Sequence, residues 1–341
     1  MQGEVTAIGA AARHIILRLK KKEDSELKIG IAGYGRLGAA CERAAFQRDN
    51  TEIAGIFSRR KVTSLFKTPV YDIKDAACFA KDIDVMILCG GSAGSLRNDA
   101  VNLARFFDTV DSFDTHEEIE SHLSALDRIQ KKRKGVSVVS AGWDPGLFSL
   151  ARGLFSAVLP GGTSYTFWGK GTSQGHGEAV RGIAGVRNAV QYTVPKENAR
   201  NMAREGKIFA ARPSDMHKRV CYVVKEQGAD EAEIEKKIRT MPYYFENYDT
   251  EVYFVSERDF NKNHTSGAHA GEVIRNGTVA GKRVNMNFAL RLESNPDFTA
   301  GVLLTFAEGA VKMKKDGYCG AYSVFDVPVG YLLTKPYGEF I

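Results

Sequence analysis

The chain has 341 residues, with 47 Lys plus Arg against 41 Asp plus Glu, and a formal net charge of +6. A content of 43% hydrophobic and 26% charged residues is that of a globular protein large enough for two domains. Part of the positive charge lies in one N-terminal cluster, Arg18 to Lys22, so nucleic acid is not an implied partner, whereas an anionic small ligand is compatible.

The five cysteines are scattered and include no Cys-x-x-Cys pair, so we predict no metal site, and a reducing cytoplasm fits best. Even the apolar segment Val85 to Cys89 is too short to cross a bilayer, and we expect no membrane partner. Residues 1–26 lack the alternation that begins at Leu27. The favoured interpretation is a disordered extension; the alternative is a short amphipathic, transit-like or membrane-touching helix.

From Leu27 onward, short apolar strands alternate with helical stretches, which is typical of a parallel sheet wrapped by helices. The predicted strands are Lys28–Ala32, Glu52–Phe57, Asp84–Cys89, Phe107–Asp111 and Val136–Ser140. The predicted helices are Arg36–Gln47, Leu96–Phe106 and Glu117–Lys134. Residues 27–143 are therefore predicted to form a Rossmann-type, doubly wound α/β domain.

After Trp143 the strand-like runs become longer and richer in β-branched and aromatic residues. These runs are Thr163–Trp168, Ala189–Val194, Arg219–Val224 and Thr250–Val255. They predict a second, mixed α+β domain over residues 144–295. Helical spacing returns in Phe298–Lys314, and we expect residues 296–341 to complete the first domain.

A Gly-x-Gly-x-x-Gly motif directly follows the first predicted strand and opens the first predicted helix, which is the setting that dinucleotide binding requires. Gly33 permits the tight turn, Gly35 lets backbone N–H groups approach a pyrophosphate, and Gly38 lets the helix pack on the strand. The alternative is a glycine-rich turn that serves packing alone.

The second predicted strand ends in Ser58-Arg59-Arg60, at the position where an NAD-specific protein places a carboxylate for the ribose 2′-hydroxyl. Two guanidinium groups and a hydroxyl instead suit a 2′-phosphate, because arginine offers planar, charge-assisted donors. The pattern predicts NADP as the cofactor. The alternative is that Arg59 and Arg60 are solvated loop charges.

Ligands of an open parallel sheet bind outside the carboxyl ends of its strands. The predicted strand ends are followed by Cys89–Ala93, Asp111–His116 and Ala141–Gly146, so Asp114 and Asp144 are expected to converge beside the site of hydride transfer. Paired acids suit an amine substrate, because they can hold an ammonium, accept its proton and stabilise an iminium. The alternative is that each acid only caps the helix that follows it.

With these features, the chain resembles the meso-diaminopimelate D-dehydrogenase family from about Leu27 to Pro328. The segments that carry the resemblance are Gly55–Arg60, Asp111–His116, Gly142–Gly146, Thr166–Gly169, Ser173–His176, Ala189–Thr193, Thr240–Pro242 and Asn295–Thr299. Such an ordered set is far more specific than any lone motif.

The resemblance implies an enzyme that uses NADP to deaminate the D-configured centre of meso-2,6-diaminopimelate oxidatively and reversibly. The products would be L-2-amino-6-oxopimelate, ammonia and NADPH, which links the reaction to lysine and cell-wall biosynthesis. It also implies a homodimer that forms through the middle domain.

Asp114, Trp143 and Asp144 match the family's residues around the D-centre, with both acids near its amine. At the distal L-centre the matching residues are Thr193, Arg219, His269 and Asn295, where Arg219 can grip a carboxylate bidentately. The other expected substrate contacts are Phe148, Trp168, Gln174, Gly175 and Glu178. Without the resemblance, His269 would be interpreted as a surface-loop histidine.

The resemblance extends the expected cofactor contacts beyond the glycines and the Ser58-Arg59-Arg60 segment. The added positions are Tyr34, Arg36, Leu37, Ser92, Ala93, Thr115, His116, Pro145, Gly146, Leu147, Phe148 and Ser149.

Three departures from the family pattern bear on affinity and substrate range. Gly94-Ser95 stands where the family usually has Thr-Asp, so a dinucleotide contact is missing or rearranged. Glu178 replaces a shorter Asp, and Ala268 and Ala270 flank the histidine where the family has Pro and Gly.

Three other functions remain open at this stage. One is a different NADP-dependent D-amino-acid dehydrogenase, and another is a sugar or cyclic-imine reductase, although those usually carry a Lys or His acid in these loops. The third is a non-catalytic NADP-binding dimer. We would expect such a protein to have lost some of Asp114, Asp144, Arg219 and His269, yet all four are present.

Overall fold

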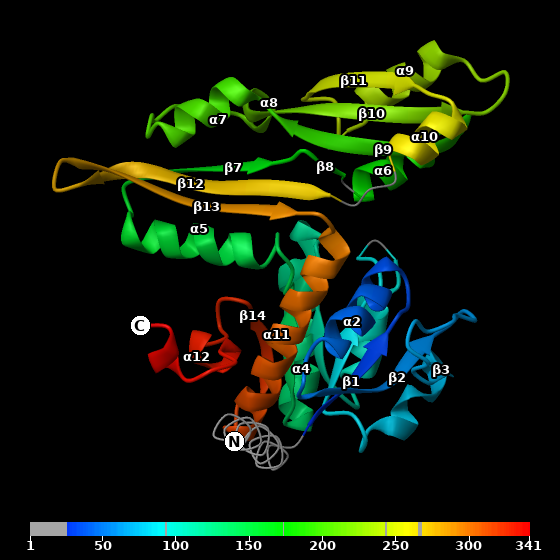
Figure 1. Cartoon of the computed structure of the whole chain (residues 1–341), viewed down its shortest axis with the longest axis vertical. Coiled ribbons are helices and arrows are strands. Elements are labelled where there is room, and N and C mark those ends of the chain that lie inside the picture. Colours follow the sequence, from blue (N-terminus) through cyan, green and yellow to red (C-terminus); the bar gives the residue numbers. More distant parts are fainter. Residues whose placement is uncertain (1–25, 93, 173, 243, 265–267) are drawn as a thin grey trace, which may run out of the picture. The chain divides into compact units, whose positions relative to one another are not determined.

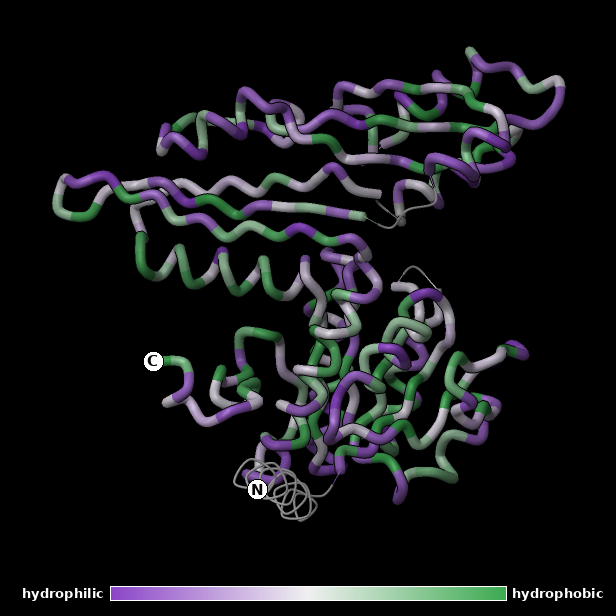
Figure 2. Tube along the Cα trace, in the orientation of Figure 1, coloured by the Kyte–Doolittle hydropathy of each residue, from purple (hydrophilic) through white to green (hydrophobic). Residues whose placement is uncertain are grey.

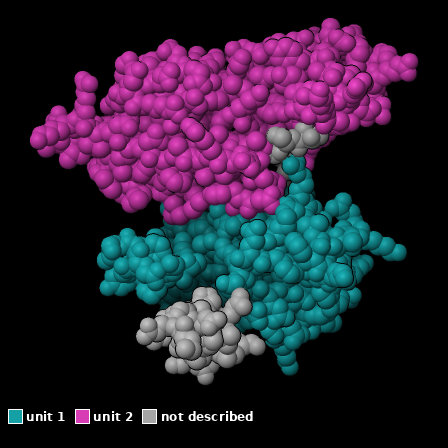
Figure 3. Space-filling model, in the orientation of Figure 1, with its two compact units in different colours: residues 1–141, 300–341 teal, residues 142–299 magenta. Residues whose placement is uncertain are grey.

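The computed structural model of the chain describes residues 26–341 except 93, 173, 243 and 265–267. Residues 1–25 of the predicted N-terminal extension and Ala93 therefore lie outside the described residues. Contacts divide the chain into two compact units: unit 1 contains residues 1–141 and 300–341, and unit 2 contains residues 142–299 (Figure 3).

Unit 1 is built on a seven-stranded sheet in which every pair of neighbouring strands is parallel, in the order β14-β6-β5-β4-β1-β2-β3 (Figure 1). Its strands are β1 (Leu27–Ala32), β2 (Thr51–Ser58), β3 (Val70–Asp72), β4 (Val85–Leu88), β5 (Asp108–Asp111), β6 (Val136–Val139) and β14 (Gly320–Ser323). The chain builds outward from β1 to β3 and then returns to place β4 on the other side of β1. This reversal is the switch point beside which such sheets bind ligands.

The predicted doubly wound fold is confirmed, and the five predicted strands agree with the observed ones to within a residue at each end. The helices of this unit are α2 (Arg36–Phe46), α3 (Leu96–Leu103), α4 (Ile119–Arg133), α11 (Asn295–Lys315, which begins in unit 2) and α12 (Val329–Leu332). In the described part of this unit, 3₁₀ turns cover Ile73–Phe79, His116–Glu118 and Tyr337–Glu339. The short strands β3 and β14 were not predicted: β3 has only three residues, and β14 (Gly-Ala-Tyr-Ser) carries no branched aliphatic residue.

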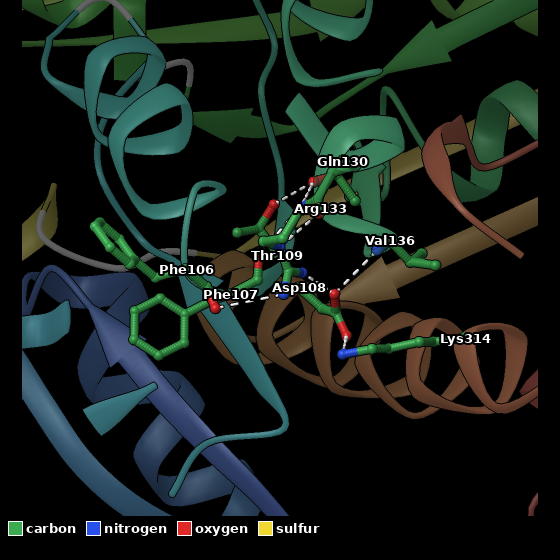
Figure 4. Close-up of polar contacts among 9 residues, drawn as sticks. Phe106, Phe107, Asp108, Thr109, Gln130, Arg133, Val136 and Lys314 are labelled. Carbon is green, nitrogen blue, oxygen red and sulfur yellow. Dashed lines mark hydrogen bonds and ion pairs between the residues drawn. The ribbon is translucent and has the colours of Figure 1, made fainter. Parts of the chain in front are cut away.

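A buried carboxylate ties two helices to the sheet of unit 1 at the amino end of β5 (Figure 4). The Asp108 side chain is fully buried and accepts hydrogen bonds from Arg133 of α4 and from the backbone N–H of Val136, at 3.0 Å. The ammonium of Lys314, near the end of α11, lies 2.8 Å from its second oxygen. A buried charge is stable only with such partners, so this cluster anchors α4 and α11 at the sheet edge opposite the glycine motif.

Unit 2 contains two sheets. The four-stranded sheet has the order β11-β10-β9-β8, and the three-stranded antiparallel sheet has the order β13-β12-β7. Their strands are β7 (Thr163–Trp168), β8 (Gly171–Thr172), β9 (Val186–Pro195), β10 (His217–Lys225), β11 (Asp249–Phe254), β12 (His269–Val279) and β13 (Lys282–Leu292). The helices are α5 (Leu147–Val158), α6 (Gln174–Arg181), α7 (Glu197–Arg204), α8 (Pro213–Met216), α9 (Glu231–Arg239) and α10 (Glu257–Asn263).

The predicted mixed α+β character of unit 2 is confirmed, but the long β12–β13 hairpin was not predicted. Ala280 and Gly281 connect its strands with φ values of +50° and +75°, which suits a tight hairpin turn. Helix α5 packs against this hairpin and is hydrophobic along most of its length (Figures 1 and 2).

Candidate active site

The glycine motif forms the turn between β1 and α2. Gly33 adopts a φ of +92°, and its N–H donates to the Phe57 carbonyl at 2.8 Å. A Cβ on Gly38 would lie only 2.2 Å from the Gly33 carbonyl oxygen, so this position requires glycine. A Cβ on Gly35 would meet no other atom within 4 Å. The turn therefore leaves open space at the positively polarised N-terminus of α2, where Gly35 is the N-cap residue.

Tyr34 holds the loop that follows β2. Its hydroxyl donates to Glu42, a buried residue of α2, and accepts the N–H of Leu65 at 3.0 Å. Burial opposes ionisation of Glu42, but hydrogen bonds from Thr68, Tyr34 and two backbone N–H groups outweigh it and lower its pKa. Burial and the bond to Glu42 raise the pKa of Tyr34 to about 12. Tyr34 thus positions the loop beside the predicted cofactor turn, and Arg36 and Leu37 form the first turn of α2.

The two predicted 2′-phosphate arginines follow the carboxyl end of β2 and are both exposed, while Ser58 is buried and accepts the N–H of Arg60 at 3.1 Å. The guanidinium of Arg59 forms a two-pronged ion pair with Asp99 of α3 and also donates to Ser95, at 3.1 Å. Among the described residues, Arg60 has no acidic partner. The two side chains therefore differ in their availability to a ligand.

The loops after β4 and β5 meet through Ser92, whose hydroxyl accepts the N–H of Asp114 at 3.0 Å. Thr115 and His116 follow at the start of the 3₁₀ turn. The Asp114 carboxylate is exposed and accepts no hydrogen bond within the described part of the chain. The capping alternative is wrong for Asp114, because Thr115 and Glu118 are the N-cap residues of the turn and of α4.

A buried Asp–His pair supports this loop and the end of β6. One oxygen of Asp111 accepts the N–H groups of Phe113 and Ser140, each at 3.0 Å, and the other lies 2.9 Å from Nε2 of His122. The Ala141 N–H donates to the Asp111 carbonyl at 2.7 Å. One residue therefore fixes both segments that lead to the two predicted acids.

In unit 2, Asp144 is held by three donors. The indole N–H of Trp168 donates to Oδ2 at 2.6 Å, and Arg152 of α5 forms a two-pronged ion pair with both oxygens. The capping alternative is wrong for Asp144 too, because the N-cap of α5 is Gly146, whose N–H donates to Ser149 Oγ at 3.2 Å. Asp114 belongs to unit 1, so the predicted convergence of the two acids stays a prediction.

Aromatic rings pack around the Asp144 segment. The rings of Trp143 and Phe148 lie 5.0 Å apart and edge to face, and both contact the position where a Cβ on Gly271 would lie. Phe148 is fully buried, so its side chain is part of the core of unit 2 and only its backbone could face a ligand. The other predicted contacts here, Pro145 and Leu147, are half-buried.

A buried guanidinium lies on the four-stranded sheet. Arg219 of β10 is 9% exposed, pairs in register with Thr193 of β9, and donates to its hydroxyl. Its guanidinium carbon lies 4.1 Å from the ring centroid of Tyr248. Among the described residues no carboxylate pairs with Arg219, and its Nε–H has no acceptor. Burial lowers the pKa of Arg219. A buried cation without an anion indicates that an anionic ligand completes the site.

His269 is the first residue of β12 and is 8% exposed, so the interpretation as a surface-loop histidine is wrong. Its ring packs on Gly171, which pairs with Thr193, and lies 4.7 Å from the ring of Trp143. Burial lowers the pKa of His269 despite its backbone hydrogen bond to Ala270. Contacts within unit 2 therefore link the Trp143 region to Arg219.

The remaining predicted substrate residues lie on the helices α6 and α11. Asn295 begins α11, and its side-chain oxygen accepts the hydroxyl hydrogen of Thr299 at 3.1 Å. Gln174 and Gly175 begin α6, and Glu178 is exposed on that helix. Two positions were not foreseen: Arg152, which holds Asp144, and His217.

The unforeseen His217 is 1% exposed, and its Nε2 accepts the N–H of Trp168 at 2.9 Å. Burial lowers the pKa of His217 to about 4, so the ring is neutral and can accept. A histidine at the start of a strand gave no local signal for this bond, because its partner lies 49 residues away in the chain.

The chain is similar to known dehydrogenases in sequence. Residues 142–294 match the family model of the diaminopimelic acid dehydrogenase C-terminal domain. The chain is 48% identical to the meso-diaminopimelate D-dehydrogenase of Lysinibacillus sphaericus, over 91% of this chain and 97% of that protein.

Two solved structures of related dehydrogenases have the same fold as this chain. The diaminopimelate dehydrogenase of Corynebacterium glutamicum in complex with DAP has a TM-score of 0.89 and 40% identity, covering 93% of this chain and 98% of that one. An engineered D-amino acid dehydrogenase bound to NADP⁺ has a TM-score of 0.84 and 39% identity, covering 93% and 98%.

Proposed function

Because this chain belongs to the meso-diaminopimelate D-dehydrogenase family, we propose that it deaminates the D-configured centre of meso-2,6-diaminopimelate oxidatively, with NADP as cofactor. Bound NADP⁺ supplies the hydride acceptor, so that the diamino acid, NADP⁺ and water give L-2-amino-6-oxopimelate, ammonium, NADPH and a proton. The chain is an oxidoreductase, and the reaction is reversible.

The residues of unit 1 fit NADP, and we assign dinucleotide binding to this unit. The open space at Gly35 and the N-terminus of α2 suit a pyrophosphate, since free N–H groups and the helix dipole favour an anion. Ser58 and Arg60 suit a 2′-phosphate at the end of β2. Ser92, Thr115 and the residues of the turn complete the proposed contacts.

The two acids have different tasks in this proposal. The Asp114 carboxylate is exposed and unengaged within the described residues, so it can accept the proton that the substrate ammonium must lose before an imine forms. The Asp144 carboxylate already receives three hydrogen bonds from Arg152 and Trp168. It is therefore fixed in orientation and serves to hold the amine rather than to take its proton.

The single observation that carries the substrate assignment is the buried, unpaired guanidinium of Arg219. A carboxylate of the distal L-centre would pair with it, and Thr193, His269 and Asn295 would add hydrogen bonds to the same amino-acid head. Without an anionic ligand, the burial of this charge is compensated only by the Thr193 hydroxyl and the Tyr248 ring among the described residues. Unit 2 is accordingly assigned to substrate binding.

This function can be tested by following NADPH formation with purified protein, NADP⁺ and each of three substrates: meso-, L,L- and D,D-diaminopimelate. NADPH should form with the meso isomer and not with the L,L isomer, which has no D-centre. Binding of NADPH without turnover of any diaminopimelate or simple D-amino acid would instead support a non-catalytic dimer.

We also propose that the protein is a homodimer that forms through unit 2. Leu154 and Val158 of α5 and Val279 at the end of β12 are 63%, 56% and 52% exposed, and a partner subunit would cover such apolar side chains. Light scattering should give about twice the mass of one chain, 37.4 kDa. The monomer mass at micromolar concentration would exclude the dimer.

The protein is proposed to act in the cytoplasm. Each of the five cysteines is a free thiol, which a reducing compartment maintains. Within the described residues, no helix is long and apolar enough to cross a membrane. Fractionation of the source cells should recover the dehydrogenase activity with cytoplasmic markers.

A further inference from the structure

Arg59 and Arg60 are adjacent in sequence but differ in their partners. Both terminal nitrogens of Arg59 are bound to the carboxylate of Asp99, one of them at 3.0 Å. Among the residues that the structure describes, Arg60 has no carboxylate partner. A ligand that arrives at this sheet edge therefore meets one guanidinium that is already occupied and one that is available.

The Arg59–Asp99 pair is more firmly held than an ordinary surface ion pair. The Asp99 side chain is only 10% exposed, and Ser95 donates a further hydrogen bond to its Oδ2 at 2.8 Å while accepting one from Arg59. If Arg59 moved away, Ser95 would be the one side-chain donor left to this nearly buried carboxylate among the described residues, which is unfavourable. The bond to Asp99 raises the pKa of Arg59.

This triad also explains one departure from the family pattern. Ser95, which stands where the family usually has Asp, is the residue that fixes Asp99 through its hydroxyl. The negative charge of this loop thus sits on Asp99, in the first turn of α3, where it binds the arginine that follows β2.

We propose that Asp99 withholds Arg59 from the 2′-phosphate of NADP, so that Arg60 is the guanidinium that discriminates NADP from NAD. The Asp99 carboxylate acts in two ways. It occupies both terminal nitrogens of Arg59, and it offsets the positive charge that would attract the phosphate. Asp99 is therefore a specificity-determining residue that limits the preference for NADP. This inference rests on the NADP site proposed above.

The test measures binding of 2′,5′-ADP and 5′-ADP to the full-length protein by calorimetry at low ionic strength, without substrate. Because no turnover is needed, the result is independent of whether the protein deaminates diaminopimelate. The variants are Arg59→Gln, Arg60→Gln, Asp99→Asn and the double variant Arg59→Gln/Asp99→Asn. Asp82→Asn is the matched control, since it removes the same charge before β4, at the opposite sheet edge.

Arg60→Gln should weaken 2′,5′-ADP binding about tenfold, and Arg59→Gln less than about threefold. Asp99→Asn should strengthen 2′,5′-ADP binding about fivefold, an effect that shrinks at high salt, and should leave 5′-ADP unchanged. When Asp99→Asn is already present, adding Arg59→Gln should weaken 2′,5′-ADP binding about as much as Arg60→Gln does in the wild type. Arg59 is then free to bind the phosphate. Asp82→Asn should change neither affinity.

Equal losses from Arg59→Gln and Arg60→Gln in the wild type would overturn the proposal, as would an unchanged or weaker affinity for 2′,5′-ADP in Asp99→Asn. Ser95→Ala, which removes only a hydroxyl, provides a milder second variant if Asp99→Asn lowers the yield of folded protein. It should shift the affinity in the same direction by a smaller factor.

Discussion

Unit 1 and unit 2 assemble their candidate sites in opposite ways. In unit 1 the site residues follow the carboxyl ends of successive parallel strands, so their positions can be derived from local sequence once the strands are recognised. In unit 2, the row from His269 through Gly171 and Thr193 to Arg219 runs across four strands and depends on strand register and ring packing. The charged groups differ as well: Arg60 is exposed, whereas Arg219 is buried without an anion. This difference predicts where mutations will affect substrate, cofactor or stability.

The largest effect is expected from Arg219→Met. Losing a buried pairing with the substrate carboxylate should lower kcat/KM for meso-diaminopimelate about 10³-fold. NADP affinity should not change. The free protein should be as stable as the wild type or more so, because a buried charge that has no anionic partner among the described residues is removed.

The matched control for Arg219→Met is Lys218→Met, its neighbour on β10, which is paired with Glu251 at 2.6 Å. Steady-state kinetics and thermal unfolding of both variants separate the two roles. If Arg219→Met lowered stability without raising KM, the guanidinium would be structural.

The next effect compares the two acids. Asp114→Asn should lower kcat about 10²- to 10³-fold, as expected for a proton acceptor, with little change in KM. Asp144→Asn should mainly raise KM, because the carboxylate held by Arg152 and Trp168 positions the amine. Steady-state kinetics over a range of pH, with Glu117→Gln as a control at an exposed acid near Asp114, would measure this split. Equal effects on kcat would contradict the division of tasks.

A third comparison lies within the glycine motif. Gly38→Ala should destabilise unit 1 by about 3 kcal/mol, because its Cβ would clash with the backbone at Gly33. Gly35→Ala should leave the unfolding free energy within about 0.5 kcal/mol of the wild type and weaken NADP binding about tenfold, since the methyl group enters space meant for a pyrophosphate. Chemical denaturation and cofactor titration distinguish them. Unchanged cofactor affinity in Gly35→Ala would argue against binding at this turn.

The smallest effect concerns pH. Burial lowers the pKa of both His176 and His217 from 6.5 to about 4. Both are neutral in the folded protein, so their contribution to stability is complete above pH 6.5 and is lost as the pH falls toward 4. At pH 5 each of the two histidines should have lowered the free energy of unfolding by about 2 kcal/mol. The lowered pKa of Glu42 in unit 1 predicts a loss only below pH 4.5.

This pH effect can be read from unit 2 alone, because both tryptophans of the chain, Trp143 and Trp168, lie there. Thermal unfolding followed by tryptophan fluorescence should show a midpoint that decreases between pH 6.5 and 5. His217→Gln should reduce the slope. A midpoint independent of pH over this range would show that the histidines are solvated.

Local sequence patterns were sufficient for most of the parallel sheet, since β1, β2, β4 and β6 are rich in apolar residues and are each followed by a turn or loop. The β12–β13 hairpin was missed although large apolar residues recur at every second position from Val284 onward, with Val284, Met286 and Phe288 less exposed than their neighbours. That signal was available and could have found the strand.

The site of unit 2 could not be derived in this way. The pairing of Arg219 with Thr193 depends on strand register, and the burial of His269 depends on its packing against Gly171, neither of which is encoded in neighbouring residues. The resemblance to a family supplied these positions. Likewise, nothing around Arg59 and Arg60 distinguishes them, because Asp99 lies 40 residues beyond Arg59.

An isotope label shows directly whether the hydride that NADP⁺ accepts comes from the D-centre of the substrate. meso-Diaminopimelate deuterated at the α-carbon of its D-centre is incubated with the protein and NADP⁺, and the NADPH that forms is analysed by mass spectrometry. We expect one deuterium in each NADPH and none when the L-centre carries the label. Unlabelled NADPH from the D-labelled substrate, or no NADPH at all, would contradict it.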